Sequence, residues 1–138
     1  MRMRTLSLLI LPAVMLGACT QTQAEVERAQ VREAGVQEKL AKELAGLVPG
    51  KPESCISQFP QKQSSGYGAT ILYRVNRGLV YRSDTMGGCE GIARGDILVT
   101  RTPSGQLCRG DIAQTFDQTS RFPTGSCSFG DFVPYRKP

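Results

Sequence analysis

The sequence contains no histidine and no tryptophan. Without histidine the chain cannot form a Ser-His-Asp or Cys-His catalytic set, and it has no imidazole to bind a metal or carry protons near neutral pH. The aromatic residues are limited to five phenylalanines and four tyrosines, so a small core needs covalent or other support. Composition therefore excludes the common histidine-dependent enzymes and favours a small, cross-linked domain.

The chain also lacks a long apolar run. Its longest largely apolar stretch, residues 6–16, is about half of the ~20 residues that a membrane-spanning helix requires. Pro12 lies inside it, and Arg2 and Arg4 precede it. A positively charged start followed by a short apolar segment is the pattern of a secretory signal peptide. We therefore expect export from the cytoplasm rather than a permanent transmembrane helix.

The apolar stretch ends in Leu16-Gly17-Ala18-Cys19, which resembles the lipobox of bacterial lipoproteins. The resemblance implies that Cys19 receives a diacylglyceryl group and becomes the first mature residue. Gly17 and Ala18 stand where the order Ala-Gly is more usual. The alternative is an ordinary signal peptide, for which Thr22-Gln23-Ala24 offers a cleavage site of the small-x-small type.

The odd number of cysteines supports attachment of a lipid to Cys19. The chain has five cysteines, and acylation of Cys19 would leave four, which an oxidising periplasm would pair into two disulfides. Three pairings are possible. The order of the predicted strands favours Cys55–Cys127, which would tie the domain ends, together with Cys89–Cys108. A four-cysteine zinc site is the alternative, but the close Cys-x-x-Cys pairs of such sites are missing.

Charge is moderate and spread along the chain. After removal of Arg2 and Arg4 there are 15 basic and 12 acidic residues, without a dense basic cluster. We therefore expect no nucleic-acid partner. In lipoproteins of the proteobacterial type, Asp at the second mature position is associated with retention at the inner membrane. Thr20 occupies that position here, so the resemblance implies an outer-membrane anchor facing the periplasm.

The composition divides the chain into three segments: a signal peptide at 1–18, a lipid anchor with a helical spacer at 19–50, and a β-rich domain at 51–138. Residues 24–47 are rich in helix-forming residues, and the spacing of Leu40, Leu44 and Leu47 is helical. We expect an amphipathic helix that lifts the domain off the membrane. A coiled-coil or partner-binding helix is the alternative, although the apolar stripe is short for a coiled coil.

Beyond Ser54 the sequence alternates between strand-forming runs and turn signals. The firmest prediction is a β-hairpin whose turn is Asn76-Arg77-Gly78. The predicted fold is mainly β, a small antiparallel sheet or barrel-like domain braced by disulfides and preceded by one amphipathic α-helix. The predicted strands are residues 69–75, 79–82, 96–102, 107–112 and 131–134.

Motifs that carry chemistry are weak. Arg109-Gly110-Asp111 spells an adhesion tripeptide, but it falls in a predicted strand, where Gly110 permits close packing and either charge forms a local ion pair. The glycine-rich segment 86–91 lacks the lysine of a phosphate-binding loop, so we expect it to form a turn that lets the disulfide form. We expect the aromatic residues Tyr67, Tyr73, Tyr81, Phe132 and Tyr135 to pack on the sheet, with a sugar-stacking face as the alternative. Six carboxylates are scattered along the chain, and two of them could meet in the folded protein as an acid/base pair, although their spacing does not require it. They are Asp84, Glu90, Asp96, Asp111, Asp117 and Asp131.

Several short runs between Thr70 and Pro138 resemble a family of small uncharacterised bacterial envelope proteins, a domain of unknown function that carries four cysteines. The resemblance implies a secreted, disulfide-bonded domain and brings no activity or catalytic residue with it. The runs are Ile71-Leu72-Tyr73-Arg74, Gly88-Cys89-Glu90-Gly91, Leu98-Val99-Thr100-Arg101-Thr102, Leu107-Cys108-Arg109-Gly110-Asp111 and the segment from Gly125 to Phe132.

Anchor, spacer and braced domain together favour a non-enzymatic envelope lipoprotein that binds another envelope protein or a cell-wall component, without a cofactor. Two alternatives stay open. One is a small inhibitor of a cell-wall hydrolase, and the other is an unusual histidine-free hydrolase.

Overall fold

A computed structural model describes residues 22–60 and 62–138 of the chain. The first element is helix α1 (Gln23–Glu43), which begins with a reciprocal capping box. The Thr22 hydroxyl accepts from the Glu25 backbone N–H at 3.3 Å, and the Glu25 carboxylate accepts from the Thr22 backbone N–H at 2.9 Å. This backbone hydrogen bond lowers the pKa of Glu25. The cap of the helix is therefore a defined residue, Thr22, three positions after Cys19 in the sequence.

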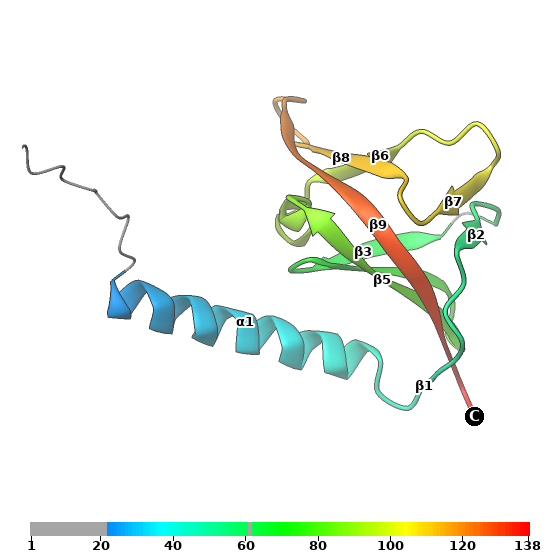
Figure 1. Ribbon diagram of the computed structural model, residues 1–138, viewed down its shortest axis with the longest axis horizontal. Coiled ribbons are helices and arrows are strands. Elements are labelled where there is room, and N and C mark those ends of the chain that lie inside the picture. Colours follow the sequence, from blue (N-terminus) through cyan, green and yellow to red (C-terminus); the bar gives the residue numbers. More distant parts are fainter. Residues whose placement is uncertain (1–21, 61) are drawn as a thin grey trace, which may run out of the picture.

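Most of α1 projects away from the rest of the molecule (Figure 1). Val31 is 69% exposed, whereas Leu40, nearer the helix end, is 3% exposed. Exposed polar side chains bond to one another along the helix, as in the Lys42–Glu38 ion pair at 2.7 Å. None of the helices within residues 22–60 and 62–138 has the length and apolar character needed to cross a membrane.

The domain that follows is built on one strongly curled antiparallel sheet with the strand order β3-β4-β5-β9-β8-β6 (Figure 1). The short strand β1 (Val48–Pro49) adds to the end of β9. Because β3 and β6 are not paired with each other, the sheet is a half-barrel open along one seam. The strands of the path are β3 (Gln63–Tyr67), β4 (Thr70–Asn76), β5 (Leu79–Gly87), β6 (Ile97–Thr100), β8 (Ile112–Phe116) and β9 (Pro123–Arg136).

The two faces of the sheet have separate hydrophobic clusters, as strand alternation requires. On the outer face, Leu40 of α1 packs with Leu72 and Val80. On the inner face the core is closed by Tyr73, Phe129 and Phe132 with their buried neighbours. The helix therefore packs on the outer face of the half-barrel, and the disulfides and the remaining elements pack on its inner face.

Two small elements close the ends of the half-barrel. The 3-10 helix η1 (Glu90–Arg94) contacts β3, β8 and β9. A second, two-stranded sheet is formed by β2 (Cys55–Ser57) and β7 (Gln106–Cys108). Its residues Ile56 and Leu107 join the inner core. The seam between β3 and β6 therefore stays open between η1 and the β2–β7 sheet.

Strand β9 contains the irregularity that fills the core. Phe129 and Phe132 are an odd number of residues apart, so a regular strand would place them on opposite faces. The register against β5 shifts between Ser83 and Thr85, which is a bulge, and both rings then point inward, with centroids 5.7 Å apart. A Cβ at Gly130 would lie 2.5 Å from the Asp84 carbonyl oxygen, so glycine permits this bend.

The fold class predicted from the sequence is confirmed: a mainly β, disulfide-braced domain preceded by one helix. The predicted hairpin is β4 and β5 around the Asn76 turn, and the third predicted strand contains β6. The aromatic residues pack on the sheet as expected, Tyr67 and Tyr135 beside the helix and the others at the inner core.

One strand prediction was wrong, and another was too short. Residues 107–112 do not form one strand, because Gly110 adopts a φ of +87° and the chain crosses there from β7 in the small sheet to β8 in the main sheet. The predicted strand at 131–134 is only the end of β9, which continues through Gly125 and Gly130 because both glycines meet neighbouring backbone closely. The sheet also begins at Val48, three residues before the predicted start of the β-rich segment.

The burial of Leu40 leads to a stability prediction. Leu40→Ala removes the side chain that joins α1 to Leu72 and Val80, so we expect a loss of about 2–5 kcal/mol in the free energy of unfolding. Val31→Ala, on the exposed part of the same helix, should change it by no more than about 0.5 kcal/mol. Urea unfolding of both variants measures the difference, and equal losses would contradict the packing described.

Candidate functional site

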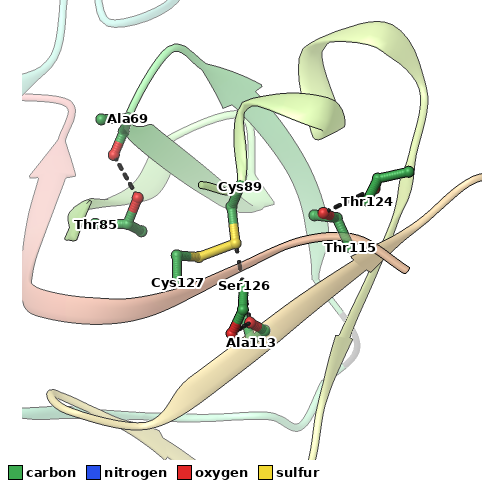
Figure 2. The surroundings of a disulfide bond; sticks show 8 residues. All are labelled: Ala69, Thr85, Cys89, Ala113, Thr115, Thr124, Ser126 and Cys127. Carbon is green, nitrogen blue, oxygen red and sulfur yellow. Dashed lines mark hydrogen bonds between the residues drawn. A yellow bond between two sulfur atoms is a disulfide. The ribbon is translucent and has the colours of Figure 1, made fainter. Parts of the chain in front are cut away.

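The half-barrel is braced internally by the disulfide Cys89–Cys127 (Figure 2). Cys127 lies on β9 opposite Gly87 of β5, and Cys89 follows Gly87 by two residues, which brings the two Cα atoms to 5.5 Å. The approach is close: a Cβ at Gly125 would overlap the carbonyl oxygen of Gly88. Both cysteines are buried, and the bond ties the beginning of η1 to the centre of the sheet.

Hydroxyl groups surround this disulfide and satisfy buried backbone groups. Thr85 donates to the Ala69 carbonyl at 2.7 Å, and Ser126 donates to the Ala113 carbonyl at 3.3 Å (Figure 2). Thr115 is fully buried, and its hydroxyl forms a hydrogen bond with the Thr124 hydroxyl at 3.0 Å. These contacts fix the half-barrel wall, so this region is structural.

The second disulfide joins Cys55 to Cys108, which lie directly opposite each other in the β2–β7 pair. The predicted pairing, Cys55–Cys127 with Cys89–Cys108, was therefore wrong. The reason is topological: β2 was not expected, and Cys108 ends β7 in the small sheet instead of opening a strand of the main sheet. Membership of all four cysteines in disulfides is confirmed. The signal that the sequence did offer is local, since Ile56 and Leu107 each adjoin a cysteine and form the apolar pair across this small sheet.

A hollow of about 300 Å³ lies at the open seam, between the small sheet and the inner face of the main sheet. We call it the mouth groove. It has the size of the smallest ligand pockets. Its lining comes from five strands and the loop between β2 and β3: Ile56, Ser57, Gln58, Lys62, Ser64, Tyr73, Leu98, Thr100 and Leu107.

The rim of the mouth groove is polar and carries one charge. Lys62 is its charged residue, and its ammonium group donates to the backbone carbonyls of Ser57 and Pro60. Partial burial lowers the pKa of Lys62 because removal from water disfavours the ammonium form. Gln58 donates to the Thr100 hydroxyl at 3.4 Å and so spans the groove's edge. This rim suits an occupant that offers hydrogen-bond acceptors or negative charge.

The floor of the groove is apolar and rigid. The Tyr73 ring packs against both Phe129 and Phe132, with centroid distances of 6.1 and 6.3 Å. Burial raises the pKa of Tyr73 well above its ordinary value, so its hydroxyl remains protonated at physiological pH. Beside the groove, Phe59 projects into solvent with 75% of its surface exposed. Apolar floor, polar rim and exposed ring are features of a binding surface.

Five of the six carboxylates considered from the sequence have separate local partners. Asp84 pairs with Arg82 at 3.0 Å, Asp96 accepts from Thr124 at 2.5 Å, and Asp131 pairs with Arg109 at 3.3 Å. Asp117 accepts from the backbone and hydroxyl of Ser120, which lowers its pKa. Asp111 accepts from the Cys108 backbone N–H at 2.8 Å. None of these residues lines the mouth groove.

The Arg109-Gly110-Asp111 tripeptide lies in the turn between β7 and β8, and its expected placement inside a strand was wrong. The expected local ion pair is present, with Asp131 as the partner of Arg109. The glycine-rich segment at 86–91 ends β5 and leads through Cys89 into η1, so it serves the disulfide turn as expected. A Cβ at Gly91 would overlap the Asp96 carboxylate, which accounts for that glycine.

Cys19, the predicted lipidation residue, lies outside the described residues. Within residues 22–60 and 62–138, no cluster of three or more Cys, Asp or Glu side chains is arranged to hold a metal ion. Comparison with protein-family models, with curated proteins and with solved structures finds no match.

The two disulfides should differ in their resistance to reduction. Cys55 and Cys108 are partly exposed, whereas Cys89 and Cys127 are each 3% exposed. We expect increasing dithiothreitol to open Cys55–Cys108 first, because thiol attack requires access to sulfur. Alkylation followed by peptide mapping identifies the thiols released at each step. Appearance of free Cys89 and Cys127 at the lowest reductant concentrations would contradict this order.

The Lys62 ammonium group, which supplies the charge of the mouth groove, should lose its proton at a lower pH than a free lysine does. The Lys62 pKa is lowered, so the groove carries its positive charge below that pKa and loses it as the pH rises through it. A titration followed by the ¹³Cε shift of Lys62 measures the midpoint, with the urea-unfolded chain as the reference. A midpoint at or above that of the unfolded chain would be the contrary result.

Proposed function

We propose that this protein is a non-enzymatic envelope lipoprotein, anchored in the outer membrane through Cys19 and binding an envelope partner through the mouth groove. The observation that carries the proposal is the groove itself. It combines an apolar floor, a polar rim with a single lysine and a rigid disulfide-braced wall, and its lining contains no carboxylate to serve as an acid or base.

The lipid anchor is supported by the way α1 begins. Cleavage by an ordinary signal peptidase after Ala24 would remove Thr22 and destroy the capping box with Glu25. Cleavage before Cys19 leaves the box whole and adds a short polar segment, Thr20-Gln21, between the lipid and the helix cap. Cleavage before Cys19 therefore keeps the helix cap, whereas cleavage after Ala24 would remove it and destabilise the first turn.

The helix suits the role of a spacer. Its 21 residues extend over about 30 Å, and the part nearest the anchor makes no core contact. A helix that is polar on most sides and stabilised by pairs along its length is typical of a solvated connection between two bodies. The spacer would hold the mouth groove clear of the lipid surface, where a partner in the periplasm can reach it.

The anchor is tested by Cys19→Ser in the native host. We expect the wild-type protein to sediment with outer membranes and to carry acyl chains on its N-terminal cysteine, since multiple chains bind a bilayer durably. The variant should appear in the soluble periplasmic fraction or remain unprocessed. Unmodified Cys19 in the mature wild-type protein would refute the anchor.

The binding role is tested by photocrosslinking in intact cells. A photoreactive amino acid replaces Gln58 at the groove rim in one strain and Arg77, in the exposed hairpin turn, in a control strain. We expect one stoichiometric adduct from position 58 and none from position 77, and Lys62→Met should reduce its yield. Equal labelling from both positions, or none from position 58, would count against the groove.

A further inference from the structure

Strand β3 is an end strand of the curled sheet with an unpaired edge, since it pairs with β4 alone. Its five residues contain neither proline nor charge, the two devices with which proteins usually protect a free edge. The two-residue turn between β3 and β4 begins with Gly68 at a φ of +57°, and the common two-residue hairpin turns require a positive φ at this position. The edge is therefore regular and accessible to pairing.

The register of the hairpin identifies the backbone groups that point outward. In a two-residue hairpin the residues flanking the turn, here Tyr67 and Thr70, form a hydrogen-bonded pair, and pairs then alternate along the strands. Ser65 and Leu72 are consequently the next bonded pair. The N–H and C=O groups of Ser64 and Gly66 point to the free edge, and none of the backbone hydrogen bonds found outside the strands in the described residues involves them.

A trough runs along this edge and offers walls on both sides. One wall is Val36 and Lys39 of α1, on the outer face. The other is Ile92 and Ala93 of η1, on the inner face. The base is the backbone of residues 64–68, and the trough reaches the mouth groove at Ser64, which lines both. An added strand would send alternate side chains to the two walls.

The residues that line this path carry only positive charge, while two carboxylates lie at its turn end: Glu33 beside Gly68, and Glu43 beside Tyr67 and paired with Arg74. The charged residues that line the trough and the mouth groove are Lys39 and Lys62, and neither lining includes a carboxylate. An occupant therefore gains from negative charge near Lys39 and Lys62, while the walls at Val36 and Ile92 favour small apolar side chains. Free backbone groups, apolar walls and lysines together describe the surface on which proteins bind an extended peptide by strand addition.

We propose that β3 receives an extended acidic segment of another protein, which adds to the sheet as a new edge strand between α1 and η1. Its backbone bonds to Ser64 and Gly66, its alternate side chains contact Val36 and Ile92, and a carboxylate reaches Lys39 or Lys62. This inference deepens the proposed binding function, on which it rests, by naming the chemistry of the partner.

The probe is a phage-displayed library of random peptides of about nine residues, long enough to cover a strand of typical length with its flanks. It is selected on the mature chain carrying Cys19→Ser. We expect selected peptides with one or more acidic residues and an alternating pattern of small apolar residues. The best of them is then synthesised, together with a scrambled version of the same composition.

Amide hydrogen exchange distinguishes strand addition from any other mode of binding. The peptide should slow exchange at the Ser64 and Gly66 amides at least about tenfold, because both gain a hydrogen-bond partner. The Ser65 amide already pairs within the sheet and should change little. Binding without protection at Ser64 and Gly66 would overturn strand addition, and so would failure to select any peptide that binds better than its scrambled version.

A matched pair of variants tests the trough. Val36→Glu places a negative charge in the outer wall and should weaken peptide binding at least about tenfold, which corresponds to about 1.4 kcal/mol. Val31→Glu makes the same change on the exposed part of α1 and should leave the affinity within about twofold. Equal effects of the two variants would overturn the placement.

Two further outcomes have definite meanings. Protection of Ser64 and Gly66 without peptide, rising with protein concentration and matched by a dimer in sedimentation, would overturn the proposal and make the occupant a second copy of this chain. A position-58 crosslink in cells combined with no protected β3 amide would overturn strand addition while leaving the proposed binding function standing. Absence of both signals would remove both proposals.

Discussion

The bend in strand β9 is the constraint on which the rest of the domain depends. This strand pairs with β5 and β8 on its two sides and with β1 at its end. Its bulge lets Phe129 and Phe132 both point into the inner core, and the same bend curls the sheet into a half-barrel. Gly130 and Gly125 let it lie against neighbouring backbone where a side chain would collide. The Cys89–Cys127 bond is formed across this close approach, so the disulfide fastens a geometry that the glycines permit.

A curled sheet with these strand lengths does not close. Its two end strands, β3 and β6, leave a seam, and the chain uses η1 and the small β2–β7 sheet to cover the ends. What is left open is the mouth groove, with the trough beside it. The surface proposed for binding is thus a direct consequence of incomplete closure, and it lies on elements that two disulfides and the inner core hold rigid.

The helix adds a different physical property to this arrangement. Its last turns contact the sheet through Leu40 and the Glu43–Arg74 ion pair, and the rest is stabilised by its capping box and by hydrogen bonds along its own surface. Such a helix can project from the domain without a partner. In the proposed function this lets a lipid at Cys19 and a groove on the domain work at a distance from each other.

Local chemistry was readable from the sequence. Helix formers ending at Pro49-Gly50 predicted α1, and β-branched residues around the Asn76 turn predicted the β4–β5 hairpin, because both signals act over a few residues. Cysteine parity indicated two disulfides. The strand prediction failed at Gly110 and β9, since a glycine that ends one strand and a glycine that permits a bulge look the same in sequence.

The sequence by itself determined the mainly β class, the preceding helix, the cysteines available for bonding and the exclusion of histidine chemistry. Only the tertiary structure decided which cysteines pair, that Lys62, Ser64 and Tyr73 meet in one groove, and that β3 keeps a free edge. These features join residues far apart in the chain, and their distances depend on strand order and register. Register is set by the packing of the whole core, which no local pattern contains.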